Sequence, residues 1–338
     1  LHKNTTADNN VAVGTCASGC NTDGHSNVSI GFSALCTNTT GDKNIAIGHQ
    51  SLLSLATANE IVAIGYNSLR ALTTGTDNTA VGFEAGKSIT TGDRNTAMGY
   101  LALSTMTTVA DNTAVGYKAM TANTSGSNNT AVGKDAMLAN TTGANNVAIG
   151  QNALETSTSG GANTAVGQLA AQDLTTGAEN TAIGHEAGNN ITTGTNNTLL
   201  GHEAGTDAVA NVVASNGNIV IGNNYSASAK IKIDWTVTSD LRDKTEIESV
   251  PHGLNFVNQI TPIKYRFKTS RENDTPNGVT RYGFKAQEIL ALEGENPVLV
   301  DNGDTDNLKL TGAYLLPVLV NAIKELKARI EVLENEWS

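Results

Sequence analysis

The first two thirds of the chain repeat one pattern of small, apolar and polar residues every 17 positions. Most copies read Asn, Thr or Val, a small residue, an aliphatic residue and glycine, as in residues 129–133, and Ile61 is the one exception to the Asn. The glycine recurs at Gly14, Gly31, Gly48, Gly65, Gly82, Gly99, Gly116, Gly133, Gly150, Gly167, Gly184 and Gly201. Equal intervals over twelve copies indicate one supersecondary unit repeated in tandem.

The segment that ends at each glycine predicts a short β-strand. Asn, the small residue and glycine alternate with the two bulkier residues, so one face of the strand is small and the other is larger. A face of Ala and Gly indicates that another backbone approaches closely there. Stacking equivalent residues coil upon coil gives a mainly β fold, a parallel β-solenoid or β-roll, with coils roughly 4.8 Å apart.

The segments between these strands are also regular. Ala or Ser stands three residues after the glycine and is usually followed by Leu, Met or a small residue. A second glycine column, ten residues after the first, falls in Thr-Thr-Gly-Asp runs with the composition of a turn. The Ala-Leu segment is compatible with an irregular turn and equally with one turn of helix.

The apolar content of each coil is low. A coil offers about three sizeable apolar side chains, which is little burial against the conformational entropy of ordering 17 residues. We therefore expect several chains to share one core, and three is the natural number for a fibre.

The C-terminal residues change to a heptad pattern. Apolar residues follow one another at spacings of three and four, with helix formers between them: Leu316, Leu319, Ile323, Leu326, Ile330, Leu333 and Trp337. This spacing predicts a long coiled-coil-like helix that self-associates. The alternative is a helix that lies on its own domain.

Charge divides the chain into two parts. Residues 1–230 contain 8 Lys and Arg and 15 Asp and Glu, whereas residues 231–338 contain 13 and 17, an ordinary globular density. The 17-residue spacing breaks after Gly201: the next Ile-Gly pair is at Gly222, and a strand-like run over Lys230 to Val237 follows. We therefore predict a repeat shaft over residues 1–222, a connecting strand segment over 223–238, and a small α+β domain over 239–338.

The overall composition excludes several classes of protein. A net charge of −11 without a basic stripe argues against nucleic-acid binding. No apolar stretch is long enough to span a membrane, and no signal peptide is recognised. Because the chain starts at Leu1 without Met, we expect it to be a fragment that lacks an attachment region.

The three cysteines all lie in the first two coils. Their odd number excludes complete pairing within one chain, although Cys20 and Cys36 fall close in phase on adjacent coils. We interpret Cys16, Cys20 and Cys36 as small buried residues of a protein that folds in a reducing compartment. No histidine column accompanies them, so neither a metal site nor a cofactor is expected.

Two columns of the repeat have chemical character. The position after the glycine carries Phe32, His49, Tyr66, Phe83, Tyr100 and Tyr117, which suits lateral packing or, alternatively, a platform for glycans. His185 and His202 follow later in this column. We interpret them as surface residues or, alternatively, as residues that surround an ion in a trimer. The Asn column predicts a hydrogen-bonded amide ladder and not a ligand site.

The tail contains three motifs in a fixed order. Ser239-Asp240-Leu241-Arg242-Asp243-Lys244 opens it, Gly283-Phe284-Lys285-Ala286-Gln287-Glu288 follows, and Ile323-Lys324-Glu325-Leu326 lies in the predicted helix. Together, after a fibrous repeat, they resemble the intramolecular chaperone domain of endosialidases and related phage tail fibres and spikes, a family of self-cleaving serine peptidases. The resemblance covers about 100 residues. Lys285 departs from it, because many relatives have an aliphatic residue there.

The resemblance implies a trimeric domain that drives folding of the fibre and then cleaves itself off between Thr238 and Ser239. It implies Ser239 as nucleophile and Lys244 as base, with Asp240, Arg242 and Glu288 in supporting roles. A serine–lysine dyad needs a neutral amine, which burial or neighbouring cations favour. We expect that environment only after trimerisation, and we expect one cleavage per chain and no other enzyme activity.

The repeat supplies a physical reason for such a domain. Sliding one chain by 17 residues against its partners preserves nearly every contact, so a trimeric nucleus at one end is needed to fix the register. We therefore expect a homotrimeric tail fibre or spike of a virion, made in the host cytoplasm, that attaches to a host surface receptor such as a glycan. The alternative is a cellular trimeric surface adhesin with the same chaperone domain. Hydrolysis of host glycans by the shaft is disfavoured, because no carboxylate pair recurs on one face.

Overall fold

The protein consists of two compact units, Leu1–Tyr225 and Ser226–Ser338, each with a hydrophobic core of its own. The computed structural model describes residues 2–206, 211–223, 226, 239–268, 271, 273–303, 305 and 308–337. The strand predicted for Lys230–Val237 lies outside the described residues.

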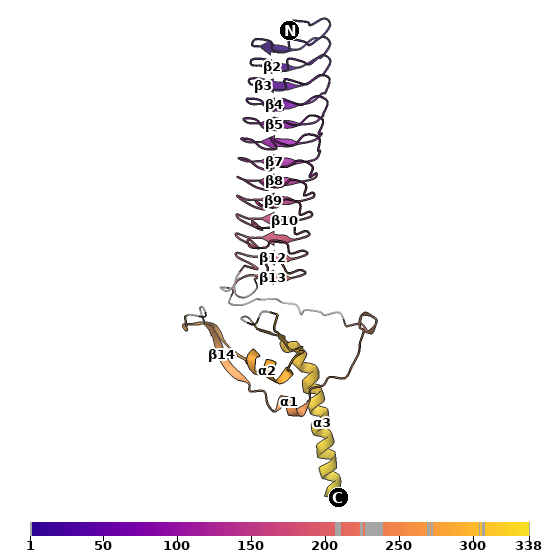
Figure 1. Cartoon of the computed structure of the whole chain (residues 1–338), viewed down its shortest axis with the longest axis vertical. Helices are drawn as coiled ribbons and strands as arrows, with labels where there is room; N and C mark the ends of the chain where they lie inside the picture. The colour runs from indigo at the N-terminus through magenta and orange to yellow at the C-terminus, as the bar shows by residue number, and fades with distance from the viewer. Residues whose placement is uncertain are drawn as a thin grey trace. The chain divides into compact units, whose positions relative to one another are not determined.

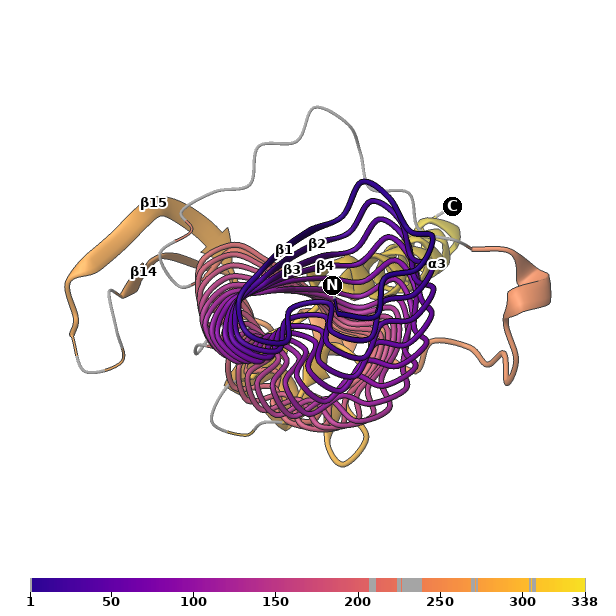
Figure 2. The same cartoon turned by 90° about the horizontal axis from the view of Figure 1, so that it is seen from above.

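The first unit is a parallel β-solenoid in which each coil contributes one strand of three residues (Figure 1). The strands are β1 (Val11–Val13), β2 (Val28–Ile30), β3 (Ile45–Ile47), β4 (Val62–Ile64), β5 (Thr79–Val81), β6 (Thr96–Met98), β7 (Thr113–Val115), β8 (Thr130–Val132), β9 (Val147–Ile149), β10 (Thr164–Val166), β11 (Thr181–Ile183), β12 (Thr198–Leu200) and β13 (Ile219–Ile221). Figure 2 looks along the stack and shows successive coils rotated gradually against each other. The predicted mainly β solenoid is confirmed.

The strands form one sheet in chain order, and each residue pairs with its equivalent in the next coil. Thr113 pairs with Thr130, for example, 17 residues on. The last pair differs, because Thr198 pairs with Ile219 over a longer coil. The 17-residue spacing breaks before β13, so the thirteenth strand of the shaft follows a coil that is longer than the others.

A single chain encloses the core of this solenoid. The middle residue of each strand, Ala in most coils, points inward, while its two neighbours point outward and are partly exposed. Further Ala, Leu, Ile and Met side chains from the turns complete the interior, as Leu52, Leu103 and Met137 do with no exposed surface. We expected several chains to share one core, but this core lies within one chain, because buried Ala side chains supply burial that a count of sizeable apolar residues leaves out.

The turn after each strand is irregular, and the alternative of a helical turn is wrong. Gly133 adopts a φ of 139°, and residues Asp135 and Met137 then adopt left-handed φ values of 55° and 50°. A third left-handed residue, Asn128 at 57°, precedes the strand. Alternation of left-handed and ordinary residues cannot form an α-helix, which needs consecutive residues in the right-handed region.

The Asn column joins each coil to the next. Asn129 donates its backbone N–H to Oδ1 of Asn112 at 3.1 Å, and its own Nδ2 donates to the carbonyl oxygen of Gly143 at 2.8 Å. Direct amide–amide bonds also occur, as between Asn180 Nδ2 and Asn163 Oδ1 at 3.1 Å. The predicted amide ladder is therefore confirmed, with backbone groups included in it.

The second unit is a small α+β arrangement. Its elements are the 3₁₀ helix η1 (Leu241–Asp243), α1 (Leu254–Val257), β14 (Ile263–Lys268), β15 (Pro276–Gly283), α2 (Ala286–Glu293), β16 (Val300–Asp301), β17 (Lys309–Leu310), the 3₁₀ helix η2 (Gly312–Tyr314) and α3 (Leu315–Glu336). β14 and β15 form an antiparallel hairpin, as do β16 and β17. The core is formed by Phe256, Ile289, Leu299, Val300, Leu315 and Val318.

The long helix α3 has two different faces. Its first two turns bury Leu315, Val318 and Ala322 in the unit. The heptad residues face away from this core, with Leu316 63% and Ile323 66% exposed. The alternative of a helix that packs on its own domain is thus realised in the first two turns, whereas self-association through the uncovered heptad face stays a prediction.

Candidate functional site

The residues predicted for catalysis lie around a tight turn at the start of the second unit. Asp240 caps η1 by accepting a hydrogen bond from the backbone N–H of Arg242 at 2.9 Å. The turn closes with the N–H of Lys244 donating to the carbonyl oxygen of Leu241 at 3.2 Å. This single turn reverses the chain between residues 239 and 244, so their side chains lie on the same side.

The turn brings Lys244 onto Ser239. Lys244 Nζ lies 2.8 Å from Ser239 Oγ and 3.2 Å from the carbonyl oxygen of Ser239. A hydroxyl and an amine at hydrogen-bond distance are the arrangement that a nucleophile and its base require. Both residues are exposed in the single chain.

An ion pair between Arg242 and Asp240 also stiffens this turn. Arg242 donates from Nε to Asp240 Oδ1 at 3.1 Å and from Nη2 to Oδ2 at 2.6 Å, which is a two-pronged contact. The Arg242 side chain holds the pKa of the Asp240 carboxyl below its usual range. Asp240 therefore stays ionised as the cap of η1, and it contacts the turn and not the hydroxyl of Ser239.

Two other predicted site residues do not join this pair. Glu288 lies in the first turn of α2, and no hydrogen bond in the described part of the chain connects it to Ser239 or Lys244. Its Oε2 is buried and has no hydrogen-bond partner among the described residues. Thr238, on the other side of the predicted cleavage site, lies outside the described residues.

Sequence reasoning missed a contact that fixes α1. Glu325 of α3 accepts a hydrogen bond through Oε2 from the backbone N–H of Leu254 at 2.8 Å. The neighbouring Asn321 donates to the carbonyl oxygen of His252 at 2.9 Å. Gly253 makes room for the Glu325 carboxylate, which would collide with any side chain there. Glu325 lies within one of the quoted motifs, but no local pattern indicates a partner 71 residues away.

The heptad residues of α3 line an apolar strip. Ile323, Leu326 and Ile330 form it together with the aliphatic parts of Lys327, Glu331 and Glu334. All of the predicted trimerisation residues are exposed: Leu316, Leu319, Ile323, Leu326, Ile330 and Leu333. A continuous row of exposed apolar residues on a helix is typical of a coiled-coil interface.

The aromatic column of the solenoid is a ladder of stacked rings. Neighbouring rings from Phe32 to Tyr117 lie 5.0–5.3 Å apart and within 19° of parallel. Each ring therefore presents its edge to solvent, because its faces are covered by its neighbours. Binding of a sugar needs an open aromatic face, so this geometry favours lateral packing over the glycan platform.

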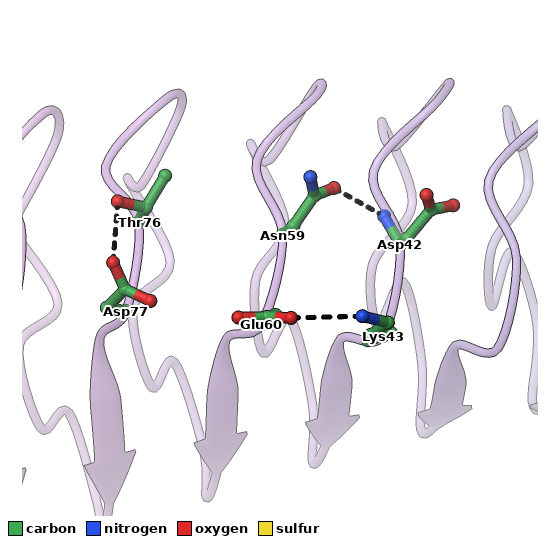
Figure 3. Close-up of a pocket in the computed structure, with 6 residues that line it drawn as sticks. All are labelled: Asp42, Lys43, Asn59, Glu60, Thr76 and Asp77. Atoms are coloured by element: carbon green, nitrogen blue, oxygen red, sulfur yellow. Dashed lines mark hydrogen bonds and ion pairs between the residues drawn. The ribbon is translucent and has the colours of Figure 1, made fainter.

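The remaining polar features of the shaft show no catalytic arrangement. Figure 3 shows a polar pocket across three coils, in which Lys43 pairs with Glu60 at 3.1 Å and Asn59 Oδ1 accepts from the N–H of Asp42 at 2.7 Å. His185 and His202 stack at 5.1 Å, each beside its own glutamate. Within the described residues no group of three or more metal-ligating side chains occurs, and no helix has the length and apolarity to cross a membrane.

Comparison with known proteins gives one match. Residues 239–298 match the model of the protein family described as chaperone of endosialidase, and this match begins at Ser239 itself. No curated protein and no solved structure matches the chain. Residues 239–298, in the C-terminal unit, are therefore similar to the chaperone domain of endosialidases.

Proposed function

We propose that the chain is a tail-fibre-like protein whose C-terminal domain drives assembly and then removes itself by one cleavage between Thr238 and Ser239. The carrying observation is that Lys244 Nζ lies 2.8 Å from the hydroxyl of Ser239, the residue at which the family match begins. A long β-solenoid directly before this domain supports the fibre assignment.

The position of Ser239 determines the chemistry. Its hydroxyl follows the predicted scissile bond directly, so it attacks the carbonyl carbon of Thr238 while Lys244 accepts the hydroxyl proton. The tetrahedral intermediate collapses with rupture of the C–N bond, and the protonated Lys244 returns the proton to the leaving amine of Ser239. Thr238 is then held to Ser239 Oγ by an ester, which water hydrolyses to a free carboxylate and a free hydroxyl.

Exposure of the dyad supports control by assembly. Lysine acts as a base only in its neutral form. Exposure to solvent favours the charged ammonium form instead. Ser239 and Lys244 are both exposed in one chain. We propose that neighbouring chains cover the pair in the assembled domain and so delay cleavage until the fibre has formed.

Two exposed apolar surfaces support a homotrimer. The first is the heptad face of α3. The second is the outward sheet face, which consists of the first and third residues of β1–β13 and contains no charged side chain. Residues such as Val13, Met98 and Leu200 remain about half exposed on it. Copies of this chain share the same length and period, so they fit this face along its whole length.

The biological role follows from the fibre assignment. We propose a component of a virion, made in the host cytoplasm, that binds a host surface receptor, with the edge-on aromatic ladder serving packing. A cellular surface adhesin with the same domain is the second candidate, supported by the same solenoid. Neither role requires a nucleic acid, a cofactor or insertion into a membrane.

The first experiment is the intact mass of freshly expressed protein under denaturing conditions. We expect the parent to give two fragments that meet between residues 238 and 239, and Ser239→Ala and Lys244→Ala to remain full length. Ser249→Ala, an exposed serine outside the turn, is the matched control and should cleave normally. A full-length parent, or cleavage in Ser239→Ala, would overturn the catalytic assignment.

A further inference from the structure

The first two coils of the solenoid bring all three cysteines of the protein together. Cys20 donates its backbone N–H to the carbonyl oxygen of Cys36 at 3.0 Å, so the two main chains are direct neighbours. The sulfur of Cys36 lies over Gly19, 3.6 Å from the position that a Cβ atom of Gly19 would occupy. Our prediction that the three cysteines are buried is wrong, because Cys16 is exposed and Cys20 and Cys36 are only partly buried; none of the three forms a disulfide in the structure.

The space for the Cys36 sulfur comes from a local change in the repeat. Gly19 occupies a column in which the other coils carry side chains: Cys36, Leu53, Arg70, Lys87, Ser104, Thr121, Leu138, Glu155, Gln172, Asn189 and Thr206. Side chains of this column touch across coils, as Gln172 Nε2 and Glu155 Oε2 do at 2.6 Å. Because Gly19 has no side chain, the Cys36 side chain has room above Gly19 and can extend toward Cys20, the next residue of the first coil.

We infer that Cys20 and Cys36 form a disulfide that joins the first two coils when the protein enters an oxidising medium. Adjacent backbones joined by a hydrogen bond have the Cα separation that disulfides need. The pKa of Cys36 is raised by burial and next by the nearby Cys20 thiol, which agrees with two sulfurs in close proximity. Cys16, which is exposed, stays a free thiol.

The reaction is ordinary thiol–disulfide exchange with a small-molecule disulfide such as oxidised glutathione. The thiolate of one cysteine attacks a sulfur of oxidised glutathione and expels one glutathione thiolate. The thiolate of the second cysteine then attacks the mixed disulfide and expels the other. The two protein thiols lose two electrons and two protons in total, and oxidised glutathione becomes two molecules of reduced glutathione.

The bond would act at one end of the described sheet. In the described sheet β1 pairs with β2 alone, whereas β2 to β12 each pair on both sides. A strand with one neighbour opens more readily than an interior strand. A covalent link between the first and second coils closes a loop of about 17 residues and restricts this opening.

The test uses the full chain, incubated with oxidised glutathione or with a reducing agent and then alkylated and weighed. We expect the oxidised parent to retain one free thiol, Cys16→Ser to retain none, and Cys20→Ser and Cys36→Ser to form no internal disulfide. An internal disulfide in Cys20→Ser, or three free thiols in the oxidised parent, would overturn the assignment.

Hydrogen exchange of the first coil tests the structural consequence separately. The N–H of Val11, which donates to the carbonyl oxygen of Asn27, should exchange at least about tenfold more slowly after oxidation of the parent. Cys20→Ser under the same oxidant is the control and should show no change. Equal exchange rates in oxidised and reduced parent, with the disulfide proven by mass, would contradict the stapling role.

Discussion

At the scale of single residues, the solenoid depends on glycines that leave room for the next coil. Gly133 has a φ of 139°, and a Cβ atom on it would lie 2.6 Å from the carbonyl carbon of Gly150. Such a contact is closer than real atoms tolerate, and the φ value itself is costly for any residue with a side chain. The regular glycine column is therefore a steric requirement of stacking.

We predict that Gly133→Ala lowers the free energy of unfolding by about 3 kcal/mol, from backbone strain and collision together. Thermal unfolding followed by circular dichroism measures the effect. Gly217→Ala is the matched control, because Gly217 also has a positive φ, 69°, but nothing lies within 4 Å of its Cβ position. Equal losses in both variants would show that contact between coils is not the cause.

His25 carries the residue-scale prediction on pH. Its Nδ1 lies 2.6 Å from Asp8 Oδ1, and this bond chiefly raises the pKa of His25 above 6.5, with charge from Asp8, Asp42 and Asp23 adding to it. A raised pKa in the folded state means that the pair stabilises the fold at low pH, below the unfolded value. This stabilisation is lost as the pH rises through the raised pKa.

An NMR titration of the His25 ring should therefore give a midpoint above 6.5 in the parent and a lower midpoint in Asp8→Asn. Asp173→Asn, on a distant coil, is the control and should leave the titration unchanged. The same midpoint in parent and Asp8→Asn would mean that the carboxylate does not bond the ring in solution.

At the scale of the coil, interior positions compensate one another in volume. Where the fourth residue after the glycine is Leu or Met, the seventh can be Asn, as in Met137 and Asn140. In two coils the fourth is glycine and the seventh is isoleucine, and Ile89 Cδ1 lies 3.0 Å from the Cβ position of Gly86. Packing to constant density explains why the interior tolerates such different residues at fixed columns.

The period alone predicted the strands, their parallel pairing and the close approach at glycine. It did not predict the left-handed turn residues, because Met137 and its equivalents Leu103 and Leu154 are not residue types that favour positive φ. The 17-residue period did not predict the position of β13, because the coil between Thr198 and Ile219 is longer than 17 residues. Local regularity is thus readable from sequence, whereas conformations imposed by stacking are not.

Ile61 interrupts the Asn column and gives the prediction at this scale. It is fully buried, and an asparagine there would accept from the N–H of Asn78 and donate to the carbonyl oxygen of Gly75, as its equivalents do. We expect Ile61→Asn to change the free energy of unfolding by less than about 1 kcal/mol, because two new bonds offset lost burial.

The comparison for Ile61→Asn is Leu103→Asn, at an equally buried position of another column. No backbone group is expected to pair with the new amide there, so the free energy of unfolding should fall by about 4 kcal/mol, as measured by denaturant unfolding. Similar losses in the two variants would show that the amide column contributes no more than apolar contact.

At the scale of the molecule, Ser239 and Lys244 were predicted from the family resemblance alone, and the structure places the two side chains together within one turn. Ser239 and Lys244 are five residues apart, and η1 suffices to join them. The role of Asp240 as the cap of that turn emerges only from the structure. What covers the exposed pair is a property of assembly, which no local motif encodes.

Assembly carries the last prediction, that the heptad face of α3 controls cleavage. Ile323→Asp combined with Ile330→Asp places charge on this face and should prevent association, so that Ser239 and Lys244 stay exposed to water. We expect cleavage at least about tenfold slower, measured as the cleaved fraction over time by intact mass. The oligomeric state of each sample is measured in parallel by native mass spectrometry.

Val320→Asp combined with Val332→Asp is the matched control, since Val320 and Val332 are exposed valines outside the heptad positions, at 51% and 58%. This variant should assemble and cleave like the parent, because both variants spare the buried face formed by Leu315 and Val318. A heptad variant that is monomeric, retains its helical circular dichroism and still cleaves at the parental rate would separate the chemistry from assembly. The dyad would then act within one chain, and release of the domain would not report completion of the fibre.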